Sequence, residues 1–308
     1  ILDFNTKKLL SDKIEYVKFT GMSWVGDDGF YYSGYSKPKE EKTKYSAKTE
    51  YQKVFYHKVG TTQEEDMLIY EDKEHPLRYV GAGVTEDERF LILSIAEGTD
   101  GSEIKIKDLQ DKSATGFITL VQGFSTNADV VDNIGDKILL KTNSAAPNYK
   151  LVLADPKNPS EANWKSIIPE TKEPLTFATT GGNKIFAGYL KDANTHVNQH
   201  DLSGKLEHNI QLPGLGTAVG FGSKKEDREF YYIFTSFTYP ATIFKYDIAS
   251  GKSTLYRKAE VKFNPENFET RQVFYPSKDG TKVPMFITYK KGLVLNGSKP
   301  AMLYAYGG

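Results

Sequence analysis

A short unit of two strands joined by a tight turn recurs along most of this 308-residue chain. Each copy begins with a short run of alternating residues and passes through a turn of Asp, Gly, Asn or Lys. It ends in a run rich in aromatic and aliphatic side chains. Turn residues between two such runs predict a β-hairpin. Five copies are visible, and they occupy residues 22–32, 83–93, 130–140, 177–187 and 219–232.

The spacing of these units limits the folds that the chain can adopt. Counted from the first residue after each turn, successive copies lie 60, 48, 47 and 45 residues apart, at Phe30, Phe90, Ile138, Ile185 and Phe230. A period near 50 residues is typical of four-stranded propeller blades, whereas leucine-rich solenoids repeat every ~20–30 residues. The sequence therefore predicts an incomplete β-propeller in which five full blades are visible.

Further strands and the composition agree with an all-β fold. The later strands of four blades are expected at residues 54–58, 103–109, 149–153 and 242–247. The chain contains 20 Tyr and 18 Phe, and 26 Gly and 13 Pro interrupt it frequently. Aromatic residues suit the pleated surface of a sheet, and Gly suits the tight turns between short strands.

The first step of the repeat is longer because it contains an additional segment, residues 36–50, which is rich in Lys, Glu and Thr. A run of mixed charge is typical of a solvated loop between two strands of one blade. A mobile gate is the alternative, because loops on a rigid scaffold often carry function. The sequence alone leaves both open.

The pattern changes after residue 263. The runs 270–275 and 282–289 predict an antiparallel pair of strands. A third run, 300–306, is continuously apolar, which is typical of a strand covered on both faces in the parallel sheet of an α/β domain. We therefore expect a partial propeller over 1–263 and the truncated beginning of a second domain over 264–308.

Charge and cysteine content exclude several classes of partner and site. Lys and Arg together number 40, as do Asp and Glu, so the basic surface typical of nucleic-acid binding is not indicated. Cys is absent, which excludes disulfides, thiolate metal sites and a cysteine nucleophile. No apolar run approaches the roughly 18 residues of a membrane helix, so we expect no membrane partner. The compartment stays open, and cytoplasmic and periplasmic locations are both compatible with the sequence.

His196 and His200 have a spacing that would bring two metal ligands together on a helix. The flanking residues read instead as turn, strand and turn. In a strand these two side chains are too far apart for one ion without further ligands. We therefore expect no metal site.

Several segments resemble the prolyl oligopeptidase family of serine peptidases. The most specific is VFYPSKDGTKVPMFI at residues 273–287, followed by YAYGG at 304–308. Similar matches upstream are VKFTGMSW at 17–24, NYKL at 148–151 and FTSF at 234–237. The likeness covers residues 13 to 308, nearly the whole chain.

This resemblance implies a seven-bladed propeller that caps an α/β-hydrolase domain, and cleavage of short peptides on the C-terminal side of proline. Only five repeats are visible, so we expect that about one blade is absent between Thr6 and Lys13 and that more precedes Ile1. The partners implied are short proline-containing peptides and the rest of the catalytic domain. The full-length protein is expected to be a monomer and to need no cofactor, because Ser-His-Asp chemistry needs none.

The catalytic serine of such an enzyme lies in a Gly-x-Ser-x-Gly elbow, and no such motif occurs in the 308 residues. None of the five His matches a catalytic position of the family. The chain alone should therefore be inactive. By resemblance, the Tyr-x-Tyr-Gly-Gly motif makes Tyr306 a donor of a hydrogen bond to the oxyanion; a core aromatic at a sheet edge is the alternative.

The resemblance also places Phe19, Val80 and Thr99 at the outer substrate subsites. Thr99 departs from the cysteine of some family members. Ordinary packing of an inner strand explains each of the three equally well.

Two other functions remain open. A propeller can serve as a binding scaffold without catalysis, because a fold does not determine a function. A related oligopeptidase with dibasic or acyl-aminoacyl specificity would share the architecture. The match around residues 274–282 favours the proline-specific branch.

Overall fold

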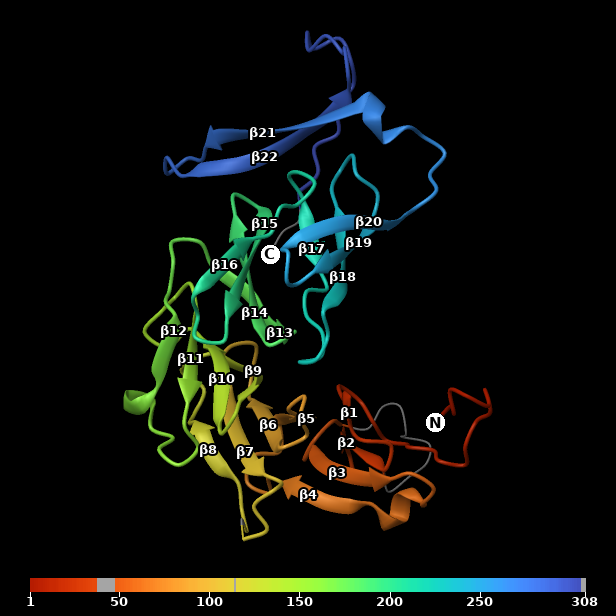
Figure 1. Ribbon diagram of the computed structural model, residues 1–308, viewed down its shortest axis with the longest axis vertical. Coiled ribbons are helices and arrows are strands. Elements are labelled where there is room, and N and C mark those ends of the chain that lie inside the picture. Colours follow the sequence, from red (N-terminus) through yellow and green to blue (C-terminus); the bar gives the residue numbers. More distant parts are fainter. Residues whose placement is uncertain (38–47, 114, 306–308) are drawn as a thin grey trace.

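The computed structural model describes residues 1–37, 48–113 and 115–305 and is built almost entirely of strands (Figure 1). Five four-stranded sheets follow one another along the chain, and a two-stranded sheet comes last. The other regular elements described are three short 3₁₀ helices: η2 (Gln63–Glu65), η3 (Glu161–Asn163) and η4 (Pro265–Asn267). Within these described residues, no helix has the length and apolar character needed to cross a membrane.

Each four-stranded sheet is a blade in which consecutive strands pair in sequence order. Blade 1 consists of β1 (Met22–Val25), β2 (Gly29–Gly34), β3 (Lys53–Lys58) and β4 (Met67–Glu71). Blade 2 consists of β5 (Tyr79–Val84), β6 (Phe90–Ala96), β7 (Glu103–Asp108) and β8 (Ile118–Val121). Blade 3 consists of β9 (Ala128–Ile134), β10 (Lys137–Thr142), β11 (Lys150–Ala154) and β12 (Lys165–Ile168).

Two more blades and a hairpin complete the described chain. Blade 4 consists of β13 (Leu175–Gly181), β14 (Lys184–Lys191), β15 (Asn194–Asp201) and β16 (Leu206–Asn209). Blade 5 consists of β17 (Thr217–Val219), β18 (Glu229–Thr235), β19 (Thr242–Asp247) and β20 (Lys252–Lys258). The final hairpin consists of β21 (Phe268–Pro276) and β22 (Lys282–Lys290).

The five predicted repeats coincide with the first two strands of the five blades, so the propeller prediction is confirmed. The turn of blade 4 illustrates why the sequence forms these hairpins. Gly181 pairs with Lys184, and the two residues between them, Gly182 and Asn183, have φ of 56° and 58°. A two-residue type I′ turn requires positive φ at both positions, which Gly and Asn tolerate best.

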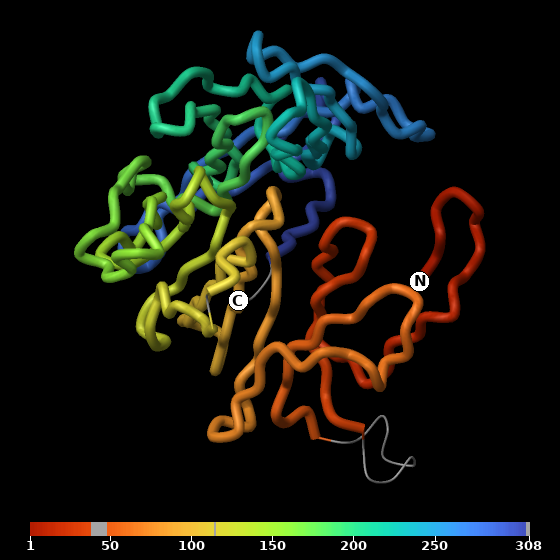
Figure 2. Tube along the Cα trace, turned by 60° about the horizontal axis from the view of Figure 1, so that its bottom comes forward, coloured from red at the N-terminus to blue at the C-terminus, as the bar shows by residue number. Residues whose placement is uncertain are grey.

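Neighbouring blades pack face to face through apolar clusters. One cluster joins blades 2 and 3, with Ile104 of β7 and Ile138 of β10 fully buried. Another joins blades 4 and 5, where the rings of Phe186 and Phe230 meet edge to face with centroids 4.8 Å apart. Such pairs add to the free energy gained by burying the rings. The blades form an arc in which blades 1 and 5 lie at the two ends (Figures 1 and 2), and the described sheets do not close into a ring.

The β21–β22 hairpin contacts the loops of blades 4 and 5. The side-chain amide of Gln272 donates to the carbonyl of Asp192, and the rings of Phe237 and Phe286 lie 5.6 Å apart. Residues 300–305 of the predicted third strand form no strand and are exposed, so this part of the prediction is wrong for the described residues. An apolar run forms a strand only where a neighbour can satisfy its backbone groups, and here none of the described strands pairs with it.

Candidate functional site: the axial cavity and its two ends

A cavity of about 720 Å³ lies where the inner strands of successive blades converge. Its lining comes mainly from β5, β9 and β13 and from residues 221–223 after β17, with further residues of β6 and of the β5–β6 turn, so four blades contribute to it. A propeller brings the first strand of every blade to the central axis, and this geometry places these residues together. The cavity is thus a property of the repeat rather than of one local motif.

The lining of the cavity combines small side chains with carboxylates. The β5 segment from Gly81 to Gly83 presents almost no side chain, and a Cβ added to Gly83 would meet open space. Packing therefore does not require glycine at position 83. Because Gly83 has no side chain, its backbone is open to the cavity. Asp129 and Asp132 of β9 also line the cavity, and each is paired with a lysine ammonium at 3.1 Å. A wall of this kind can accommodate an extended polar chain.

The inner-hairpin turns form one end of the cavity, and an ionic cluster lies there. The ammonium of Lys225, in the turn before β18, lies 3.1 Å from Asp132 and 3.8 Å from Glu86 and from Asp87. It also donates to Asn133 at 3.1 Å. Since these groups come from blades 2, 3 and 5, the cluster connects blades that are not neighbours in sequence.

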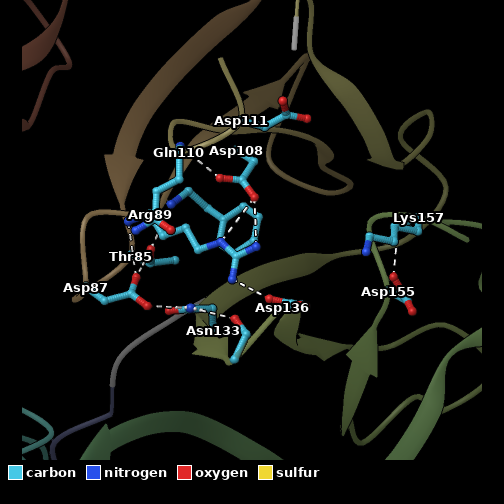
Figure 3. Close-up of polar contacts among 12 residues, drawn as sticks. Thr85, Asp87, Arg89, Asp108, Gln110, Asp111, Asn133, Asp136, Asp155 and Lys157 are labelled. Atoms are coloured by element: carbon cyan, nitrogen blue, oxygen red, sulfur yellow. Dashed lines mark hydrogen bonds and ion pairs between the residues drawn. The ribbon is translucent and has the colours of Figure 1, made fainter. Parts of the chain in front are cut away.

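The same end carries the Arg89 network of blades 2 and 3 (Figure 3). The guanidinium of Arg89 donates twice to one carboxylate oxygen of Asp108, at 3.1 and 2.9 Å, and once to Asp136 in the β9–β10 turn. These two carboxylates raise the pKa of Arg89, and the bond from Arg89 lowers the pKa of Asp136. Burial raises the pKa of Asp87, but bonds from Asn133 and Thr85 outweigh it and hold the pKa below its ordinary value. Arg89, Asp87 and Asp136 are therefore charged at neutral pH, and the bonds from Arg89 and Asn133 fix the two turns relative to each other.

The three residues that the resemblance assigns to substrate lie toward the opposite ends of the inner hairpins, near the start of a first strand or after the end of a second strand. Phe19 is 73% exposed, and its ring meets that of Tyr79 edge to face at 5.6 Å. Val80 of β5 is 2% exposed and packs in the core between blades 1 and 2. Thr99 is exposed in the turn after β6, three residues beyond Ala96, which pairs with Tyr79. The β21–β22 hairpin contacts the corresponding loops between the second and third strands of blades 4 and 5.

Gln52, which the sequence analysis did not single out, connects two of these residues. Its amide group donates to the carbonyl of Phe19 at 3.3 Å, and its oxygen accepts from the amide of Val80 at 2.8 Å. The structure thus brings Phe19 and Val80 together and leaves Thr99 on a neighbouring loop. A lone Gln before a strand gives no pattern from which this role could be predicted.

Two predictions concern residues outside the described part of the chain. Tyr306 lies beyond residue 305, and most of the 36–50 segment falls in the interval 38–47.

His196 and His200 lie on strand β15, as expected. Within the described residues no group of three or more His, Cys, Asp or Glu side chains is placed to hold a metal ion.

Comparisons with known proteins agree with this architecture. The family model described as the prolyl oligopeptidase N-terminal beta-propeller domain matches residues 1–259. A prolyl endopeptidase of Elizabethkingia meningoseptica is 50% identical over 308 residues, which are all of this chain and 43% of that protein. Prolyl oligopeptidase ophP of Omphalotus olearius is 32% identical over 309 residues, covering 97% of this chain and 41% of that protein.

Solved structures give the same result. Prolyl oligopeptidase B of Galerina marginata, bound to a 35mer hydrolysis and macrocyclization substrate, superposes with a TM-score of 0.87 at 29% identity. The alignment covers 97% of this chain and 42% of that one. This chain therefore spans less than half the length of the relatives that it matches. On the family match over residues 1–259, the chain belongs to the prolyl oligopeptidase family and carries its N-terminal β-propeller.

Proposed function

We propose that this chain is the propeller portion of a serine endopeptidase that cleaves short peptides on the C-terminal side of proline. The observation that carries the proposal is the 50% identity to a prolyl endopeptidase along all 308 residues. The small-residue wall of the axial cavity supports it, because side chains as small as those of residues 81–83 leave room for an extended peptide. The complete propeller would have seven blades, of which five are described here.

In this proposal the propeller restricts access, and residues 264–308 begin the α/β-hydrolase domain that carries the catalytic serine, aspartate and histidine. Tyr306 donates its phenolic hydrogen to the oxyanion that develops during acyl transfer. A donor held in place stabilises that charge without reorganisation. Phe19, Val80 and Thr99 lie near the outer peptide subsites, and the Phe19–Tyr79 pair offers an apolar surface there.

The test is hydrolysis by the full-length protein of a Gly-Pro chromogenic substrate compared with an Arg-based one. We expect cleavage of the first and little of the second. Preference for the Arg substrate would indicate a related oligopeptidase, and no hydrolysis of either would favour a binding scaffold. In the active protein, Tyr306→Phe should lower kcat by roughly 10²–10³-fold, as loss of one oxyanion donor does elsewhere.

A further inference from the structure

Both polar atoms of the Gln52 carboxamide form hydrogen bonds, although the residue lies in a loop. Gln52 is 3% exposed and immediately precedes strand β3. Its amide donates to the carbonyls of Lys18 and Phe19, at 3.1 and 3.3 Å, and its oxygen accepts from the amide of Val80. One side chain thereby joins three segments that are distant in sequence. A buried polar group of this kind is costly to leave unpaired, so its partners are strongly constrained.

Val80 lies on the innermost strand of blade 2, and blade 1 satisfies both of its outward backbone groups. Gln52 accepts from its N–H at 2.8 Å, and the hydroxyl of Ser33 donates to its carbonyl at 2.5 Å. The junction of the first two blades is therefore fixed at this residue. The neighbouring residue, Tyr79, carries the ring that Phe19 contacts.

Phe19 has a backbone conformation that needs support. Its φ is 50°, in the left-handed region that residues other than glycine rarely adopt. Its exposed ring gains little from packing, so the surrounding contacts must hold the conformation. The bond from Gln52 to the Phe19 carbonyl is one such contact.

We propose that Gln52 is a positioning residue, whose hydrogen bonds hold Phe19 and Val80 in a fixed arrangement. This arrangement allows the rings of Phe19 and Tyr79 to receive an apolar side chain of the peptide, upstream of the cleaved bond. The proposal rests on the proposed function for the identity of the ligand. The fixed arrangement of Phe19 and Val80 rests only on the hydrogen bonds of Gln52. Gln52 does not touch the substrate and acts through the two residues that it joins.

The test uses Gln52→Glu in the full-length protein. Glu keeps the size of the side chain and can accept from Val80, but it cannot donate to the Lys18 and Phe19 carbonyls. The matched control is Gln199→Glu, since Gln199 is equally buried. It donates to the carbonyl of Ile248 and to Glu207, both at 3.0 Å, and lies in blade 4.

Two readouts separate positioning from loss of stability. For peptides with a Phe at one of the positions upstream of the proline, Gln52→Glu should raise KM by about 10-fold and leave kcat unchanged. KM for the short Gly-Pro substrate should change less than about 2-fold. Amide exchange at Val80 should become faster in Gln52→Glu and stay unchanged in Gln199→Glu. Equal KM changes for the two substrates, or the same changes in both variants, would overturn the proposal.

Failure of the proposed function would be seen separately. If the wild-type protein does not cleave after proline, the positioning role is decided by the exchange rate of the Val80 amide in the two variants. Faster exchange of the Val80 amide in Gln52→Glu alone would support the positioning role of Gln52, and an unchanged exchange rate would refute it.

Discussion

Lys225 and Asp132 form an ion pair at 3.1 Å although they belong to blades 5 and 3, which are not neighbours. Asp132 is 3% exposed, and it also accepts from the backbone amide of Glu86 and the hydroxyl of Thr180. The pair therefore joins non-adjacent blades at the turn end of the cavity. A charge this deeply buried depends on its partners for stability.

Replacing Lys225 with Met should lower the free energy of unfolding by about 1–2 kcal/mol, because the buried carboxylate loses a charged donor but keeps two hydrogen bonds. Thermal melts of the two proteins measure the difference. Lys224→Met is the control, since the ammonium of Lys224 makes none of the contacts described for Lys225. Equal losses in the two variants would argue against the cross-blade pair.

His200 should make stability depend on pH in the weakly acidic range. Its Nδ1 lies 2.9 Å from the carbonyl of Gly204, and its buried Nε2 has no hydrogen-bond partner among the described residues. Burial lowers the pKa of His200 below its ordinary value of 6.5, and the Gly204 bond only partly opposes this. The unfolded chain then binds a proton more readily, so stability is lost as pH falls below 6.5 toward the folded-state pKa.

His200→Gln removes the titrating group and should flatten the melting temperature between about pH 6.5 and 5. Melts across pH 8 to 5 provide the measurement, in steps of about half a unit. His196→Gln, at an exposed position of the same strand, serves as the control. An unchanged slope in His200→Gln would refute the assignment.

The sequence was sufficient to locate the blades because each hairpin is encoded locally. In blade 4 the turn Gly182–Asn183 and the two strands that it joins lie in one continuous segment, so the hairpin is visible in the sequence. The third strand over 300–306 could not be judged in the same way. Its apolar pattern describes a buried strand, but pairing depends on elements elsewhere, and no described strand lies beside residues 300–305.

The site was less predictable for a related reason. Phe19 and Val80 were selected by resemblance, whereas Gln52 and Lys225 act through contacts across 28 to 139 positions of the sequence. A single Gln or Lys in a polar loop has no periodicity that distinguishes it from a solvated residue. These side chains find their partners only in the folded protein, where different blades lie against one another.

His57 should prove important for holding the N-terminal segment on blade 1. It is fully buried, and its ring nitrogens lie 2.7 Å from Asp66 and 3.2 Å from Asp12. His57→Leu leaves two buried carboxylates without this partner and should cost about 3–5 kcal/mol. Limited proteolysis should then cut within residues 1–20 faster than in the wild type. Lys58→Leu, altered at the exposed neighbouring position, should keep the wild-type pattern; resistance of His57→Leu would contradict the role.

The outer face of blade 5 should make residues 1–308 associate when they are produced alone. Strand β18 alternates between buried and exposed residues, and the exposed set includes Tyr231 and Ile233. The ring of Tyr231 contacts that of Tyr256 at 4.7 Å, which extends the apolar face to β20. Contiguous exposed apolar surface favours self-association. Size-exclusion chromatography should therefore show species larger than a monomer, and Tyr231→Thr with Ile233→Thr should shift them toward the monomer. A single monomeric peak with a cooperative melt for the unaltered segment would refute this expectation.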